Sequence, residues 1–110
     1  MRLRPVPFLS AVAVVAASLP VFAQGPVGNA EAAKTKVSMC IGCHGIPGYK
    51  AAYPEVYHVP KISGQTPAYI VNALKAYKAG ERSHGSMRGV ASSLTEQDMA
   101  DLAAYYGARK

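Results

Sequence analysis

Two stretches of the chain place apolar residues at intervals of three and four positions, which is the spacing of one face of an α-helix. The first stripe consists of Ile70, Ala73, Leu74 and Tyr77. Thr66 and Pro67 precede it, and these residue types favour the N-cap and the first helical position. Gly80 follows it, and glycine commonly ends helices. The pattern therefore predicts a helix over residues 67–79.

A second stripe near the C-terminus predicts the last helix. Its apolar face consists of Met99, Leu102, Ala103 and Tyr106. Thr95 is suited to the N-cap, and Glu96 and Asp98 place negative charge in the first turn, where the helix dipole favours it. Gly107 is expected to end this helix.

The rest of the chain predicts little further regular structure. Residues 30–39 are rich in helix formers and are expected to form a short helix. Residues 24–29 are expected to be a flexible leader, and the glycine-containing segments 45–64 and 81–94 are expected to be loops. No alternation of apolar and polar residues indicates a strand, and the sequence contains no repeat. We therefore expect an all-α domain with long loops.

The first 23 residues have the features of a secretory signal peptide. Two arginines stand within the first four residues, an apolar run follows over residues 8–19, and Val21-Phe22-Ala23 is a cleavage site of the small-residue type. The alternative is an uncleaved membrane anchor, but the run is shorter than the ~20 residues that a spanning helix needs. We expect cleavage before Gln24 and a periplasmic protein.

Cleavage would leave a single domain, residues 24–110, with ten basic and six acidic residues and a net charge of +4. Four of the basic residues lie in one part of the sequence: Lys75, Lys78, Arg82 and Arg88. They favour either a weak docking patch for an acidic protein or an ordinary solvated surface. No motif or dense basic run indicates nucleic-acid binding. We expect a monomer that is not inserted in a membrane.

The strongest chemical signal is Cys40-Ile-Gly-Cys43-His44, which contains both cysteines of the chain. Residues at i, i+3 and i+4 share one face of a helical turn, so two thiols and an imidazole can point at one object. This spacing is typical of covalent haem attachment, with two thioethers from the cysteines and the histidine on the iron. It predicts one haem c.

Three other interpretations of the cysteines have weaker support. A catalytic dithiol is expected beside a βαβ pattern, and none is visible. A structural zinc site needs four ligands, whereas His58 and His84 are the only other histidines and lie far apart in the sequence. A disulfide between Cys40 and Cys43 would close a very short loop and constrain the unfolded chain little.

The candidates for the sixth iron ligand are three methionines, two histidines and a lysine. Met39 precedes Cys40 and lies on the His44 side of the ring, and Met99 belongs to the apolar stripe of the last helix. Met87 stands in a polar, glycine-bearing segment where a flexible thioether can reach an iron, and we place it first. The next candidates are His84, then His58, then an open or water-ligated iron. A thioether raises the reduction potential and closes the iron to substrates, which predicts an electron carrier.

These residues together resemble the small, soluble, monohaem class I c-type cytochromes of the bacterial periplasm. The matching pieces are Cys40-Ile-Gly-Cys43-His44-Gly45, Pro60-Lys-Ile-Ser-Gly64-Gln65, Tyr69 through Tyr77 to Gly80, Met87, and Leu94-Thr-Glu-Gln-Asp98 with Leu102-Ala-Ala-Tyr105-Tyr106. In order along the chain, they cover nearly all of residues 24–110.

The resemblance implies three main helices, with the first and last packed across each other. It implies thioethers from Cys40 and Cys43, iron ligation by His44 and Met87, and a backbone carbonyl of Pro60 that accepts a hydrogen bond from His44. The segment from Gly45 to Val59 is longer and richer in tyrosine than a minimal member of this family, and its role stays open.

The expected function is one-electron transfer between protein partners, such as a reductase and an oxidase or dehydrogenase, and not an enzymatic reaction. Two alternatives stay open. One is a haem subunit or relay of a larger oxidoreductase complex. The other is a peroxidase or gas-binding haem protein with labile distal ligation.

Overall fold

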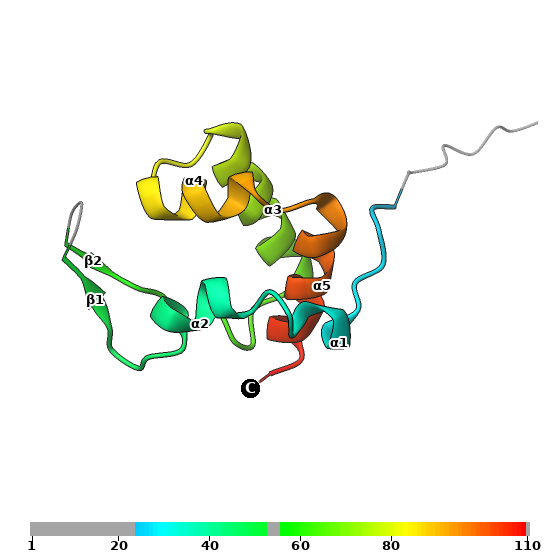
Figure 1. Ribbon diagram of the computed structural model, residues 1–110, viewed down its shortest axis with the longest axis horizontal. Coiled ribbons are helices and arrows are strands. Elements are labelled where there is room, and N and C mark those ends of the chain that lie inside the picture. The colour runs from blue at the N-terminus through cyan, green and yellow to red at the C-terminus, as the bar shows by residue number, and fades with distance from the viewer. Residues whose placement is uncertain (1–23, 53–55, 110) are drawn as a thin grey trace, which may run out of the picture.

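Three helices pack around the hydrophobic core in the computed structural model, which describes residues 24–52 and 56–109 (Figure 1). They are α1 (Ala30–Ala33), α3 (Pro67–Ala79) and α5 (Glu96–Gly107), with α5 packed against both of the others. The predicted signal peptide lies outside the described residues. The most deeply buried large side chains are Leu94, Met99 and Leu102, each 1% exposed.

The two helices predicted from apolar stripes are present with the predicted ends. Thr66 accepts a hydrogen bond from the backbone N–H of Tyr69 at the start of α3, and Gly80 ends the helix in the left-handed conformation, with a φ of 82°. At the start of α5, Thr95 and Asp98 form a capping box, in which each side chain accepts the other residue's backbone N–H. Local sequence therefore determines both elements.

The helix predicted over residues 30–39 is instead two short helices, α1 and α2 (Ser38–His44). The chain turns between them, where the hydroxyl of Thr35 donates to the carbonyl of Ala32 at 3.1 Å. Such side-chain hydrogen bonds compete with the helical pattern. The expected contact between the first and last helices is confirmed, because α1 packs on α5 and Ala33 is completely buried there.

The second half of the segment predicted to be a flexible leader is held against α5. The side chain of Gln97 donates to the carbonyl of Val27, and the backbone N–H of Asn29 donates to Asp101, both at 2.8 Å. Gly28 lies so close to α5 that a Cβ on it would stand 2.1 Å from the carbonyl oxygen of Ala100. The prediction was wrong here because the partners of these residues lie about 70 positions along the chain.

The segment of residues 45–64 is mostly loop, as predicted, but it contains a small antiparallel hairpin. Strand β1 (Lys50–Ala51) pairs with β2 (Tyr57–His58), with Lys50 opposite His58. Figure 1 shows this hairpin at the opposite end of the molecule from α1. It projects beside α2 and extends the wall of the cavity described below.

The prediction of a loop over residues 81–94 was wrong, because this segment contains helix α4 (Gly85–Ser92). Its glycines weaken the helix signal. Its apolar residues nevertheless have helical spacing, and Ala91 is completely buried where α4 packs on α3. Among the described residues, no helix is long and apolar enough to cross a membrane.

Candidate haem site

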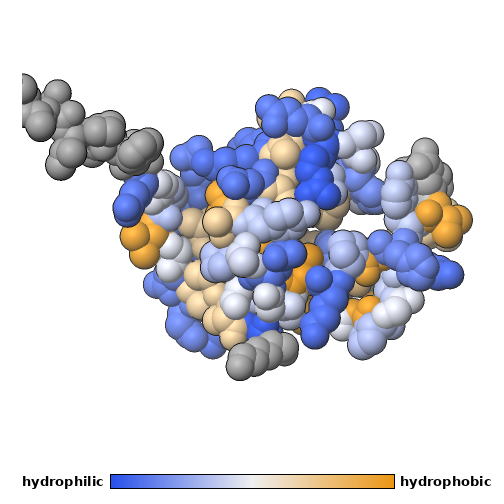
Figure 2. All heavy atoms as spheres, turned by 180° about the vertical axis from the view of Figure 1, so that it is seen from behind, coloured by the Kyte–Doolittle hydropathy of each residue, from blue (hydrophilic) through white to orange (hydrophobic). Residues whose placement is uncertain are grey.

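A cavity of about 570 Å³ opens between α2, the hairpin, α3, α4 and α5. It brings together all the residues that the sequence proposed for a haem: Cys40, Cys43, His44, Pro60 and Met87. Apolar residues supply most of the remaining wall, among them Ile62, Ile70, Leu74, Val90 and Leu102. Figure 2 shows the molecule from behind, with a gap in the packed atoms bordered by hydrophobic residues.

Helix α2 presents both thiols and the imidazole from one short stretch of helix. Neither cysteine is in a disulfide. Cys40 is half-buried and Cys43 is exposed, and burial raises the pKa of the Cys40 thiol. The i, i+3, i+4 spacing thus has the helical geometry that covalent attachment requires.

The imidazole of His44 is oriented by the backbone of Pro60. The Nδ1 atom of His44 lies 2.7 Å from the carbonyl oxygen of Pro60, which can only accept a hydrogen bond. Nδ1 therefore carries the proton, and the lone pair of Nε2 is left for a metal. This is the contact that the family resemblance implies.

Met87 lies in the first turn of α4 and lines the same cavity as His44. It is half-buried and packs against the edge of the hydrophobic core, so it is not the isolated side chain that the sequence suggested. Met99 is 1% exposed within the core, as expected from its position on the apolar stripe of α5. Met39, by contrast, also lines the cavity and is 41% exposed.

The two other histidines line the cavity in different ways. His84 is the N-cap of α4, and His58 is exposed on β2. Among residues 24–52 and 56–109 no group of three or more His, Cys, Asp and Glu side chains is placed to hold a metal ion. The four ligands of a structural zinc site are therefore not assembled in this part of the chain.

Tyr106 is a cavity residue that the sequence pattern predicted only as core. Its side chain is 5% exposed, and its buried hydroxyl has the weakly hydrogen-bonding Cys40 thiol as a neighbour and no partner at regular hydrogen-bond geometry in the described part of the chain. Burial, with the neighbouring Cys40 thiol as the second cause, raises the pKa of Tyr106 to about 12. A buried hydroxyl with only weak hydrogen bonding is costly, so this position is suited to a bound group with a hydrogen-bond acceptor.

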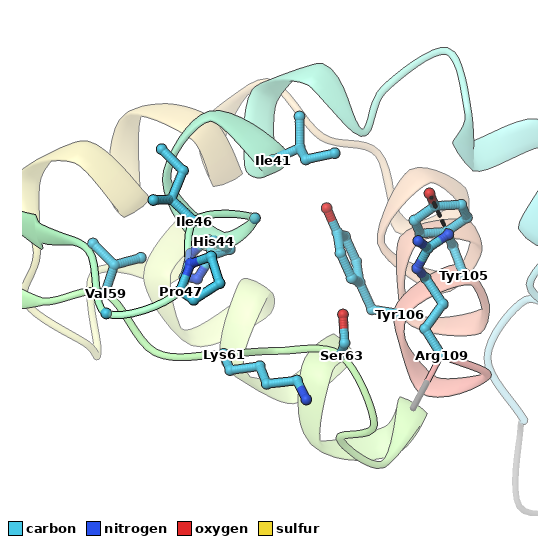
Figure 3. A pocket seen from close by; sticks show the side chains of 12 residues that line it. Ile41, His44, Ile46, Pro47, Val59, Lys61, Ser63, Tyr105, Tyr106 and Arg109 are labelled. Carbon is cyan, nitrogen blue, oxygen red and sulfur yellow. Dashed lines mark hydrogen bonds between the residues drawn. The ribbon is translucent and has the colours of Figure 1, made fainter.

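A second cavity, of about 370 Å³, lies on the other side of His44 and shares His44 and Tyr106 with the first. Figure 3 shows the Tyr106 hydroxyl pointing toward α2, with Lys61 and Ser63 below it. Arg109 donates to the hydroxyl of Tyr105 at 2.9 Å, the dashed contact in the figure. The two cavities are therefore neighbours, and Val59 and Lys61 also line both of them.

The basic residues singled out in the sequence all make intramolecular contacts. Lys75 lies 3.2 Å from Glu96, and Lys78 donates to the carbonyl of Leu94 at 2.5 Å. The guanidinium of Arg82 lies 4.7 Å from the centre of the Tyr77 ring, and that of Arg88 lies beside Gly80. These contacts tie α3 to the segments that follow it.

The donor set fits a covalently bound haem. The cavity volume is within the range of cofactor sites, and the wall is apolar with a few polar groups, as such sites usually are. The thiols of Cys40 and Cys43, the imidazole of His44 with its available Nε2, and the thioethers of Met87 and Met39 all line it. A helical frame with this donor set defines a c-type cytochrome domain.

Comparison with known proteins gives the same class. The family described as Cytochrome c matches residues 30–106, and the chain therefore belongs to the cytochrome c family. Cytochrome c-554(548) of Halomonas halodenitrificans is 36% identical over 86 residues, which cover 76% of this chain and 99% of that protein.

Cytochrome c4 proteins are also similar, over part of their length. Cytochrome c4 of Pseudomonas aeruginosa is 35% identical over 83 residues, which cover 76% of this chain and 39% of that protein. The crystal structure of reduced recombinant cytochrome c4 from Pseudomonas stutzeri matches with a TM-score of 0.61 at 34% identity, covering 76% of this chain and 47% of that one. The chain thus spans less than half the length of these two proteins.

Proposed function

We propose that this chain is a periplasmic, monohaem cytochrome c that carries single electrons between protein partners, with His44 and Met87 as the two axial ligands of the iron. The observation that carries the proposal is that Cys40, Cys43, His44 and Met87, from two separate helices, line one cavity. The cytochrome c family, to which the chain belongs, consists typically of electron-transfer proteins.

The bound haem supplies a one-electron iron couple, and the chain holds and tunes it. Cys40 and Cys43 are the attachment points, and the Pro60 carbonyl fixes the His44 ring so that Nε2 is available as a ligand. With haem bound, the thioether of Met87 would supply a neutral, soft ligand that favours the reduced state and leaves no place on the iron for a substrate. Apolar residues of α3 and α5 line the site and would limit the access of water to a bound haem.

Replacing Met87 by Ala in the haem-loaded protein tests the ligation. We expect the far-red sulfur-to-iron band of the ferric spectrum to disappear, the reduction potential to fall, and the ferrous form to bind carbon monoxide rapidly. The matched control is Met39→Ala, because Met39 lines the same cavity from the His44 side. If the band survives in the Met87 variant, or if the unmodified protein already binds carbon monoxide rapidly, Met87 is not the ligand.

A haem relay within a larger complex is the second candidate, because the cytochrome subunit of sulfide dehydrogenase from Chlorobaculum tepidum is 34% identical over 68 residues, which cover 62% of this chain. The two functions differ in what the protein is bound to. A carrier should purify from periplasmic extract at moderate salt as a separate protein, whereas a relay should co-purify with a fixed set of partners at high salt.

A further inference from the structure

The first turn of α4, which contains Met87, is capped by an unusual residue. His84 is the N-cap, in extended conformation, and its Nδ1 atom accepts the backbone N–H of Met87 at 3.4 Å. Ser, Thr, Asp and Asn are the residue types that usually make this contact. A histidine in this place therefore calls for a reason beyond helix capping.

The hydrogen bond to Met87 argues against His84 as an iron ligand. Because Nδ1 accepts the N–H of Met87, the neutral ring carries its proton on Nε2. Neither nitrogen then has a lone pair for a metal. His84 is therefore placed to act through Met87 rather than to replace it as a ligand.

A second contact holds the ring of His84 from across the cavity. The ring of Tyr57, on strand β2, meets it edge-on, with ring centroids 4.8 Å apart and planes at 62°. This is a favourable aromatic geometry, and a serine or aspartate at the N-cap would not provide it. The contact links the tyrosine-rich hairpin, which has no other assigned role, to α4.

The remainder of α4 is held independently of this contact. Ala91 is completely buried against the core, and the guanidinium of Arg88 lies beside Gly80 at the end of α3. In the first turn, Gly85 and Ser86 are exposed, and a Cβ on Gly85 would meet no atom within 4 Å. The cap at His84 is therefore a side-chain hydrogen bond that holds the turn of Met87, beside the packing of Met87 against the edge of the core and the hydrogen bond from the backbone N–H of Arg88 to the carbonyl of His84.

We propose that His84 is a positioning residue for Met87, and that Tyr57 holds the His84 ring so that the hairpin determines how firmly the Met87 thioether stays in place. The inference rests on the proposed ligation by Met87. It gives the hairpin a role, because contact with Tyr57 keeps the first turn of α4 formed and displacement of the hairpin loosens it.

The experiment compares His84→Ala with His84→Asn in the haem-loaded protein. Alanine removes the acceptor, whereas asparagine keeps a cap oxygen. We expect His84→Ala to lose the sulfur-to-iron band at a lower temperature than the global loss of helix seen by circular dichroism. Its observed rate of carbon monoxide binding should rise roughly five- to tenfold, which corresponds to the loss of a typical N-cap. His84→Asn should restore most of both properties.

A second variant acts on the same turn without altering α4. Tyr57→Ala should shift the band and the carbon monoxide rate in the same direction, by a smaller amount, because it removes the ring contact and leaves the cap. The matched control is Tyr49→Ala, in the same segment, which should change neither. This variant keeps the inference testable if His84→Ala does not fold.

The outcomes separate this inference from the proposed function. If the unmodified protein lacks the sulfur-to-iron band, Met87 ligation and the positioning role fail together. If Met87→Ala loses the band but His84→Ala and Tyr57→Ala behave like the unmodified protein, only the positioning role fails. It also fails if His84→Asn does not restore the band, because the cap would then not be what His84 provides.

Discussion

The two sides of this molecule differ in how complete their packing is. On the side of α1, α3 and α5, Leu94 and Met99 are each 1% exposed and Ala33 is completely buried. On the side of α2 and the hairpin, α2 contains no buried residue, and Val56 is 75% exposed. The first side is a completely packed hydrophobic core, and the second side surrounds a cavity of about 570 Å³. The difference indicates that a cofactor completes the second side.

Removing the attachment points should produce the largest effect on this contrast. In the double variant Cys40→Ala, Cys43→Ala, we expect complete loss of covalent haem, measured by a haem stain after denaturing electrophoresis. Without the cofactor, hydrogen exchange should become fast in α2, the hairpin and α4, and should stay slower in α3 and α5, which pack against each other and contribute most of the buried side chains.

The control for this variant is Ile41→Ala, which lies between the cysteines and is 51% exposed. It leaves both thiols and His44 in place and should keep the stain. Persistent covalent haem in the double cysteine variant would contradict the assignment. Uniform loss of exchange protection over the whole domain would contradict the division into two sides.

Two methionines test the same contrast at the level of single side chains. Met99→Ala removes a core side chain that is 1% exposed, and should lower the free energy of unfolding by about 2–5 kcal/mol. It should leave the sulfur-to-iron band of the folded protein unchanged, whereas Met87→Ala removes that band. Urea unfolding and the ferric spectrum measure the two properties. Loss of the band in Met99→Ala would show that the two sides are not separable in this way.

The side of α1, α3 and α5 is also the part of the structure that the sequence predicts best. The ends of α3 and α5 follow from Thr66, Gly80 and the Thr95–Asp98 capping box, whose partners all lie within a few residues. Their stripes then determine which faces meet. The attachment motif is equally local, since one turn of helix brings its three side chains together.

The cavity side depends on contacts between distant residues, which no local pattern indicates. Helix α4 was missed because its glycines suggest a loop and its N-cap, His84, is an uncommon residue for that position. The edge contact of His84 with Tyr57 joins residues 27 positions apart. The burial of the Tyr106 hydroxyl beside Cys40 likewise joins residues that are far apart in the sequence.

The packing of residues 27–29 against α5 gives a third prediction, which concerns the edge of the packed core. In Gly28→Ala the new Cβ would stand 2.1 Å from the carbonyl oxygen of Ala100, and backbone must move to relieve this contact. We expect a loss of about 1–3 kcal/mol in unfolding free energy, the usual effect of overpacking, and faster hydrogen exchange at Asn29. Gly25→Ala is the matched control, because a Cβ on Gly25 meets no atom within 4 Å. Equal stability of the two variants would mean that the leader does not pack as described.

The smallest predicted effect concerns the ion pair that ties the turn after α1 to the start of α5. The Lys36 ammonium, followed by the backbone N–H of Thr95, lowers the pKa of Asp98 from 3.8 to about 2. Because the folded pKa lies below the unfolded one, the stabilisation is complete above about pH 4 and is lost as the pH falls toward 2.

Asp98→Asn should therefore lose about 1–2 kcal/mol of unfolding free energy at neutral pH and show a flatter dependence of stability on pH in this interval. Lys36→Met should flatten the profile in the same way, since Lys36 is the main cause of the shift. Chemical unfolding between pH 2 and pH 5 measures how the unfolding free energy changes with pH. Identical slopes in the unmodified protein and both variants would show that this ion pair does not join the turn after α1 to α5 in solution.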